Sequence, residues 1–229
     1  MASSQLHRAR PLLIVPVGST EQHGPHLPLD TDTRIAGAVA AAAAAHLGGD
    51  ALLAPALAYG ASGEHHGFPG TVSIGTAALT AVLVEYGRSA CDWAARVVFV
   101  NGHGGNVDAL RAAVGLLRDE SRDAAWCSCA VPEGPEGDAH AGHTETSLLL
   151  HLSPGLVRTD EMCAGNTEPL AGLMPALRRG GVAAVSSSGV LGDPTTATAQ
   201  AGADLFAAMV DDCVGRLRRW HPDDTGMLT

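Results

Sequence analysis

The sequence predicts an α/β fold with three layers, α/β/α, in which helices cover both faces of a mostly parallel central sheet. Short apolar runs rich in branched residues alternate along the chain with longer segments of helical character, and this alternation is typical of a parallel sheet. The apolar runs are continuous, without a polar residue at every second position, as expected of strands that are buried on both faces.

Each expected strand is a run of apolar residues that ends at a turn residue or at a polar segment. Each expected helix is rich in Ala, which has the highest helix propensity, or carries apolar residues at helical spacing. In chain order, the expected elements are strand 11–17, helix 33–47, strand 51–57, helix 76–95, strand 96–100, helix 107–120, strand 124–131, helix 144–152, a short strand at 182–187, and helix 197–220.

The length of 229 residues suits one domain, so we expect residues 1–229 to form a single unit with residues 1–10 as a flexible end. The breaker-rich segment P-E-G-P-E-G, residues 132–137, is interpreted as a loop, because the chain that follows it is too short for a second α/β domain.

Composition and charge exclude several classes of protein. The formal net charge is −10, which disfavours binding to nucleic-acid phosphates. No apolar run reaches the roughly 18 residues of a membrane span, and the N-terminal residues lack the apolar core of a signal peptide. The five Cys are scattered and odd in number, which argues against a disulfide framework. We therefore expect a cytoplasmic protein without nucleic-acid or membrane partners.

Polar side chains that could carry out chemistry follow the predicted strands. Residues 19–32 follow the first strand and residues 62–66 the second, His103 follows the third, and His140 and Glu145 follow the fourth. The carboxyl ends of parallel strands meet at one edge of a sheet, where ligands bind. We therefore expect these separate segments to converge on one site.

The segment after the first strand, G-S-T-E-Q-H-G-P-H-L-P-L-D-T-D-T, has the character of a metal site. Glu21 and His23 are two residues apart and face the same way in an extended chain, and His26, Asp30 and Asp32 follow. Imidazoles mixed with carboxylates suit zinc, iron or manganese rather than calcium. The alternative is a polar loop that caps the next helix, but three carboxylates so close together repel one another without a cation.

The segment N-G-H-G-G-N, residues 101–106, places His103 at the centre of a glycine-rich turn. Gly residues allow a tight turn and a close approach to the backbone. The alternative is a turn that binds phosphate at the start of the next helix, but no Lys follows it as in a P-loop. We therefore expect His103 to be a metal ligand.

The segment H-A-G-H-T-E-T-S, residues 140–147, contributes His140, His143 and Glu145. Glu145 would lie in the first turn of a helix, where it could bind metal or simply stabilise the positive end of the helix dipole. Histidines beside a carboxylate in a cleft favour ligation or proton transfer. For His143 we expect a structural role or a contact behind the ligands.

The segment G-A-S-G-E-H-H-G-F-P-G-T, residues 60–71, contributes Glu64, His65 and His66. Its many Gly residues suit a loop that lines a pocket. We expect Glu64 to contact the substrate as a catalytic residue. The same role is less strongly indicated for His65 and His66. The alternative is a polar loop with an acidic tip.

Together these segments resemble the motifs of the creatininase family. The matching stretches are G-S-T-E-Q-H-G-P-H-L-P-L-D-T-D, S-G-E-H-x-x-F-P-G-T, N-G-H-G-G-N, H-A-G-x-x-E-T-S and, at residues 189–198, G-V-x-G-D-P-x-x-A-T. The resemblance implies a metal-dependent amidohydrolase with two divalent ions per chain, zinc first, with iron or manganese as alternatives. It implies that Asp32 is shared by both ions and that His140 is the catalytic histidine. The implied metal ligands are Glu21, His23, Asp32, His103 and Glu145.

Within that family the chain is similar to peptidases of mycofactocin maturation, from the first motif to the ending G-M-L-T. The similarity implies hydrolysis of a modified ribosomal precursor peptide near its C-terminus, which releases a small core derived from Val and Tyr. Hydrolysis of a small cyclic or formyl amide is an alternative, and a metal-binding scaffold without turnover is another. Creatinine is disfavoured, because creatinine hydrolases carry a Glu where this chain has Gly105.

The ligand set predicts the chemistry. Divalent ions lower the pKa of a water molecule toward roughly 7, and this water then attacks an amide carbonyl. His140 is expected to protonate the leaving nitrogen. We also expect a homo-oligomer, partly because the family forms closed oligomers and partly because a chain rich in Ala and Gly leaves broad apolar faces.

Overall fold

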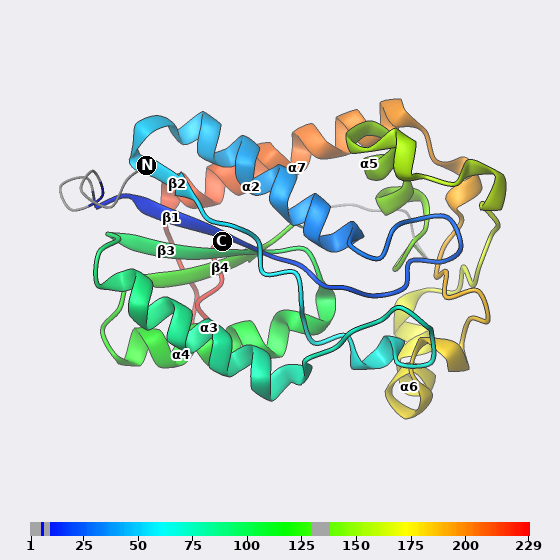
Figure 1. The fold of residues 1–229 in the computed structure, drawn as a ribbon, viewed down its shortest axis with the longest axis horizontal. Coiled ribbons are helices and arrows are strands. Elements are labelled where there is room, and N and C mark those ends of the chain that lie inside the picture. The colour runs from blue at the N-terminus through cyan, green and yellow to red at the C-terminus, as the bar shows by residue number, and fades with distance from the viewer. Residues whose placement is uncertain (1–5, 7–9, 130–137) are drawn as a thin grey trace.

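A parallel sheet of four strands lies between two layers of helices in the computed structural model of the protein, which describes residues 6, 10–129 and 138–229 (Figure 1). The spatial order of the strands is β2-β1-β3-β4, and all three strand pairs are parallel. The predicted three-layer α/β/α fold is therefore confirmed. The strands are β1 (Leu12–Val17), β2 (Ala51–Leu53), β3 (Arg96–Asn101) and β4 (Ala124–Ser128).

Different helices cover the two faces of the sheet. Successive residues of a strand point to opposite faces, so Ile14 and Val98 pack beneath α2, α5 and α7, whereas Val15 and Phe99 pack beneath α3 and α4. Burial of both faces explains the continuous apolar runs in the strand sequences. The helices are α2 (Thr31–Leu47), α3 (Gly75–Cys91), α4 (Val107–Asp119), α5 (His143–Leu152), α6 (Leu170–Gly180) and α7 (Ala199–Arg219).

The strand expected at 51–57 is shorter in the structure. β2 ends at Leu53, two residues before Pro55, which has no N–H to donate to a neighbouring strand. Leu57 still pairs with Val17 in an isolated bridge. The end of the strand expected at 124–131, the loop expected at 132–137 and most of the end expected at 1–10 lie outside the described residues.

The prediction of a short strand at 182–187 is wrong. Residues Val182–Ala184 form a 3-10 turn instead. Gly181 adopts a φ of 66°, and its carbonyl oxygen accepts a hydrogen bond from the N–H of Ala184. The chain therefore folds back on itself here, and its backbone groups are used within the turn.

α6 has no counterpart among the expected elements. Pro175 lies inside it, and Pro disfavours the interior of a helix, which obscured the helical spacing of its apolar residues in the sequence. Figure 1 places α6 beyond the carboxyl ends of the strands, apart from the helices that flank the sheet.

The last helix, α7, covers the sheet of its own chain. Met209, Val210 and Leu217 are buried in the core beneath it, and its N-terminal Thr198 accepts a hydrogen bond from the N–H of Ala201. The five Cys are free, with Cys127 and Cys213 buried. None of the helices in the described part of the chain has the length and hydropathy of a membrane-spanning segment.

Candidate active site

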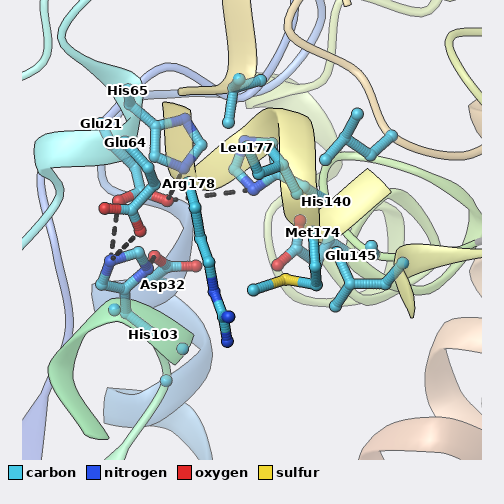
Figure 2. Close-up of a pocket in the computed structure, with 17 residues that line it drawn as sticks. Glu21, Asp32, Glu64, His65, His103, His140, Glu145, Met174, Leu177 and Arg178 are labelled. Carbon is cyan, nitrogen blue, oxygen red and sulfur yellow. Dashed lines mark ion pairs between the residues drawn. The ribbon is translucent and has the colours of Figure 1, made fainter. Parts of the chain in front are cut away.

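A pocket of about 490 Å³ opens at the carboxyl ends of the strands. One side is formed by carboxylates and imidazoles that follow β1, β3 and β4, and the other side by α6 (Figure 2). The lining residues are Glu21, Asp32, Glu64, His65, Gly102, His103, Gly104, Gly105, Ala139, His140, Glu145, Leu170, Met174, Leu177, Arg178, Val182 and Leu191.

Glu21, Asp32 and His103 form a buried group whose ligand atoms lie within 4.8 Å of one another. His103 stands between the two acids, with its Nε2 3.2 Å from Glu21 Oε2 and its Nδ1 3.2 Å from Asp32 Oδ2. All three side chains are at most 6% exposed. Two separate segments of sequence, 19–32 and 101–106, thus deliver two carboxylates and one imidazole to one point.

A second group consists of His23, Asp32 and Glu145, whose ligand atoms also lie within 4.8 Å of one another. His23 Nε2 is 3.2 Å from Asp32 Oδ1 and 3.8 Å from Glu145 Oε2. Asp32 therefore faces His23 with one oxygen and His103 with the other. The five residues expected as ligands come together around this shared carboxylate.

Hydrogen bonds behind the cluster fix its geometry. The Ser19 hydroxyl donates to Asp32 Oδ2 at 2.6 Å, and the Asn101 side chain donates to the carbonyl oxygen of His103 at 2.7 Å. Asn106 ties the same turn to β1 by donating to the carbonyl of Gly18. A Cβ at Gly102 would lie 2.5 Å from the carbonyl oxygen of Asp32, so only Gly allows these two segments to approach.

Without cations the cluster compensates its negative charge with protons. Burial opposes the charged form of His23, but the attraction of Asp32 outweighs it and raises the pKa of His23 to about 10. Burial opposes the charged form of His103 too, but the adjacent carboxylates of Asp32 and Glu21 outweigh it and hold the pKa of His103 well above its usual value. Burial raises the pKa of Glu145 to about 7.

The residues present fit a centre for divalent cations. Glu21 Oε2 is buried and accepts no hydrogen bond from any described residue, although the His103 ring lies beside it. A buried carboxylate oxygen without a donor is costly unless a cation is bound. The donor set of two imidazoles and three carboxylates is that of zinc, iron or manganese.

His140 lies beside this cluster, and its hydrogen bonds define its tautomer. Its Nε2 is 2.8 Å from the backbone carbonyl oxygen of Gln22, which can only accept, so Nε2 carries the proton. Nδ1 is left as the acceptor and lies 3.9 Å from Glu21 Oε1. Burial and the neighbouring His23 hold the pKa of His140 well below its usual value, so the ring is neutral.

Gln22 is a site residue that the motif analysis missed. Its Oε1 accepts from the N–H of Gly24, so its Nε2 is the amide nitrogen and donates to the carbonyl of Gly189 and to His65 Nδ1. Nε2 of His65 then carries the proton and faces Glu21 Oε1 at 3.3 Å. One buried Gln therefore orients both His65 and His140; a polar residue between two ligands was the signal that could have revealed it.

Glu64 lies at the rim of the cluster. Its Oε1 is 3.3 Å from His103 Nε2, and its side chain is 35% exposed. Burial opposes ionisation of Glu64, but the hydrogen bond from His103 outweighs it and lowers the pKa of the carboxyl. A Cβ at Gly105 would lie 2.6 Å from Glu64 Oε1, so Glu64 occupies the space that a side chain at position 105 would need.

Four other polar residues of the motifs lie outside the main pocket. His26 is buried with its Nε2 2.9 Å from the hydroxyl of Thr146, and burial lowers its pKa to about 4. Asp30 pairs with Arg34 one turn along α2. His143 contacts the Thr196 hydroxyl, in keeping with the structural role expected of it. His66 is exposed and lines a separate cavity.

The apolar side of the pocket comes mainly from α6, which the sequence did not indicate. Met174 and Leu177 face the cluster across the pocket, with Arg178 beside them (Figure 2), and Leu170 also lines it. Leu170 is 44% exposed, so this side of the pocket is open. A second cavity of about 360 Å³ adjoins the first and shares Glu64 and Gly105 with it.

Comparison with known proteins places this pocket in a family. Residues 1–217 match the family model described as creatininase, creatinine amidohydrolase. A protein of Mycolicibacterium smegmatis named mycofactocin precursor peptide peptidase is 66% identical over 231 residues, covering 99% of this chain and 92% of that protein. A protein of the same name from Mycobacterium tuberculosis is 65% identical over 235 residues, with the same coverage of both chains.

Solved structures agree with the sequence comparison. A structure titled "Creatininase Mn" has a TM-score of 0.78 and 29% identity, and the match covers 96% of this chain and 95% of that one. A mutant creatininase of "Zn-Zn type" has the same TM-score at 28% identity, with 96% of this chain and 94% of that one covered. The chain therefore belongs to the creatininase family, and it is a hydrolase that uses divalent metal to cleave amide bonds.

Proposed function

We propose that this protein is the peptidase that cleaves the modified mycofactocin precursor peptide near its C-terminus and releases the core derived from Val and Tyr. The observation that carries the proposal is the 66% identity, over 99% of this chain, with a relative named mycofactocin precursor peptide peptidase. We also propose that residues 1–229 form one catalytic domain that works in the cytoplasm.

The shape of the pocket supports a peptide as the substrate. The main cavity adjoins a second one that shares Glu64 and Gly105 with it, and the two together offer room for a chain that extends beyond the scissile amide. A small cyclic or formyl amide would need neither the second cavity nor the open apolar side formed by α6. The alternative of a scaffold without turnover is disfavoured, because Glu145 remains 23% exposed and faces an open pocket, whereas structural metal sites are closed.

We propose two divalent ions, zinc first, with iron or manganese as substitutes. Glu21, Asp32 and His103 would hold one ion, and His23, Asp32 and Glu145 the other, with Asp32 shared. Such ions supply an activated water and polarise the amide carbonyl. The alternative grouping of Glu21, His23 and His140 would use the histidine that we assign to proton transfer.

His140 is the proposed carrier of the proton. Its Nδ1 is unprotonated and faces the cluster, so it can accept a proton from the attacking water. An imidazole of low pKa becomes a strong acid once it is protonated, and it then donates that proton to the leaving nitrogen. Glu64 would hold the substrate by accepting a hydrogen bond from a peptide N–H at the rim.

A test of this function is incubation of the purified protein, loaded with zinc, with the modified precursor peptide, followed by mass spectrometry. We expect two products, a shortened peptide and the small core. Creatinine and formamides serve as competing substrates under the same conditions. Turnover of a small amide with an intact precursor peptide would refute the proposal and favour the alternative.

A homo-oligomer is also part of the proposal. Leu29, Tyr59, Val72 and Ile74 are exposed apolar residues on three segments joined by backbone hydrogen bonds. The bonds from Glu21 to Leu29 and from Val72 to Thr20 connect these segments next to the metal ligands. Exposed apolar residues that cluster in this way favour association between copies of a chain.

A further inference from the structure

Among the described residues that line the main pocket, Arg178 is the one Lys or Arg. It projects from α6, next to Met174 and Leu177, and Figure 2 shows its side chain extended into the pocket between the Glu21–Asp32 side and the Glu145–Met174 side. Its neighbour Arg179 is also exposed but does not line the pocket. The two arginines thus differ in their relation to the site although they are adjacent on one helix.

No carboxylate of a described residue lies within 4 Å of the Arg178 guanidinium. The pocket acids Glu21 and Asp32 face the histidines of the cluster instead. Arg178 therefore places in the pocket a positive charge that is not paired with a carboxylate of any described residue.

A guanidinium at the open side of a pocket suits one kind of ligand. It presents planar N–H donors that match the two oxygens of a carboxylate, and its own positive charge attracts an anion. The side chains of Met174 and Leu177 beside it offer an apolar surface to the rest of such a ligand. An amide substrate that fits here carries a carboxylate next to an apolar residue.

We propose that Arg178 is a specificity-determining residue that binds a carboxylate of the peptide substrate, while Met174 and Leu177 contact the apolar residue beside it. This inference rests on the proposed peptidase function. The carboxylate can be the C-terminus of the peptide or an acidic side chain, which offer the same chemistry to the guanidinium.

Kinetics with matched peptides test the proposal. Arg178→Gln is expected to raise KM for the precursor peptide by about 10- to 100-fold, the range for loss of a charge-assisted hydrogen bond, with a much smaller change in kcat. Arg178→Lys keeps the positive charge but loses the paired N–H donors of the guanidinium, so its KM should lie between that of the unaltered enzyme and that of Arg178→Gln. Arg179→Gln is the control and should behave as the unaltered enzyme.

Peptide variants identify the source of the carboxylate. One series replaces the C-terminal acid by an amide, and another replaces each Asp or Glu by Asn or Gln. The peptide that lacks the recognised carboxylate should have a raised KM with the unaltered enzyme and no further loss with Arg178→Gln. A peptide with Lys in place of the recognised acidic residue should bind to the Arg178→Glu variant, because the two charges are then exchanged.

A binding measurement separates this inference from the proposed function. Titration calorimetry with the metal-depleted protein, which does not cleave the peptide, should show weaker binding by Arg178→Gln than by Arg179→Gln. If the loaded enzyme cleaves no peptide, the peptidase proposal fails, while the calorimetry still decides the role of Arg178. Equal Kd and KM values for Arg178→Gln and the unaltered protein would overturn the inference.

Discussion

The two sides of the pocket differ in burial, in chemistry and in how tightly the rest of the molecule holds them. The side that follows the strands is buried, with Glu21 1% and His103 6% exposed, and Ser19, Asn101 and Gln22 hold it from behind. The side formed by α6 is half open and mainly apolar. The buried side is suited to hold the reacting groups in a fixed geometry, and the side formed by α6 is suited to contact the substrate.

Changes on the buried side should therefore abolish the reaction, whereas changes on the α6 side should alter the choice of substrate. The largest effect is expected from Glu21→Gln and from His103→Ala, because each removes a proposed metal ligand from the buried group. Both should reduce turnover below detection and leave the far-UV circular dichroism unchanged.

Controls for these variants are Glu85→Gln and His46→Ala, which alter an exposed acid and an exposed imidazole away from the pocket. Metal content by elemental analysis should fall below two ions per chain in the two ligand variants and stay constant in the controls. Full activity in either ligand variant would show that the ligand assignment is wrong.

His140→Ala should behave differently from the ligand variants. It removes the proposed proton carrier, so kcat should fall by about 10²- to 10⁴-fold, the range for a general acid or base, while both ions remain bound. Loss of metal together with loss of rate would instead assign His140 to the group with Glu21 and His23.

Metal binding should strengthen as the pH rises. In the metal-free protein the pKa of His23 is about 10, so its ring is protonated at neutral pH. A metal ligand must be the neutral imidazole, so each ion displaces protons, and the affinity rises with pH until His23 deprotonates near its own pKa. Titration with zinc in buffers of different ionisation enthalpy would measure the protons released, and an affinity independent of pH would contradict this prediction.

Gln22→Leu should have a smaller effect, because Gln22 orients imidazoles without contacting the proposed ions. The substitution removes the donors to His65 and Gly189 but leaves the backbone carbonyl that holds His140. We expect kcat to fall by about tenfold, close to the contribution of one or two hydrogen bonds. Gln200→Leu, which alters an exposed Gln on α7, is the control and should leave kcat unchanged.

The buried side of the pocket could be predicted from the sequence for a physical reason. Its residues follow strands whose apolar runs are unmistakable, and parallel strands bring their carboxyl ends together. Charged residues such as Glu21 and Asp32 so close to buried strands also require a partner. Gln22 was missed because an uncharged amide does not need a partner of opposite charge, although it contacts the rings of both His65 and His140.

The α6 side could not be predicted in the same way. Pro175 within the helix argues against helix formation. Of its apolar residues only Leu173 is buried, because the other large ones face the pocket rather than the core. The position of α6 over the pocket depends on tertiary contacts, such as the close approach of Gly181 to the backbone of Glu64. Substrate choice is therefore harder to read from the sequence than the chemistry.

The smallest expected effect on the chemistry concerns assembly. If copies of the chain associate through the exposed residues Leu29, Tyr59, Val72 and Ile74, light scattering at micromolar concentration should give a mass above the 23.2 kDa of one chain. Tyr59→Glu should weaken the association, because it places a charge in an apolar interface, and Leu116→Glu, on the exposed face of α4, is the matched control. The metal content of Tyr59→Glu should be unchanged, since its side chain is not among the proposed ligands. A fully active monomer would refute the proposed assembly, and the buried side of the pocket would then be complete within one chain.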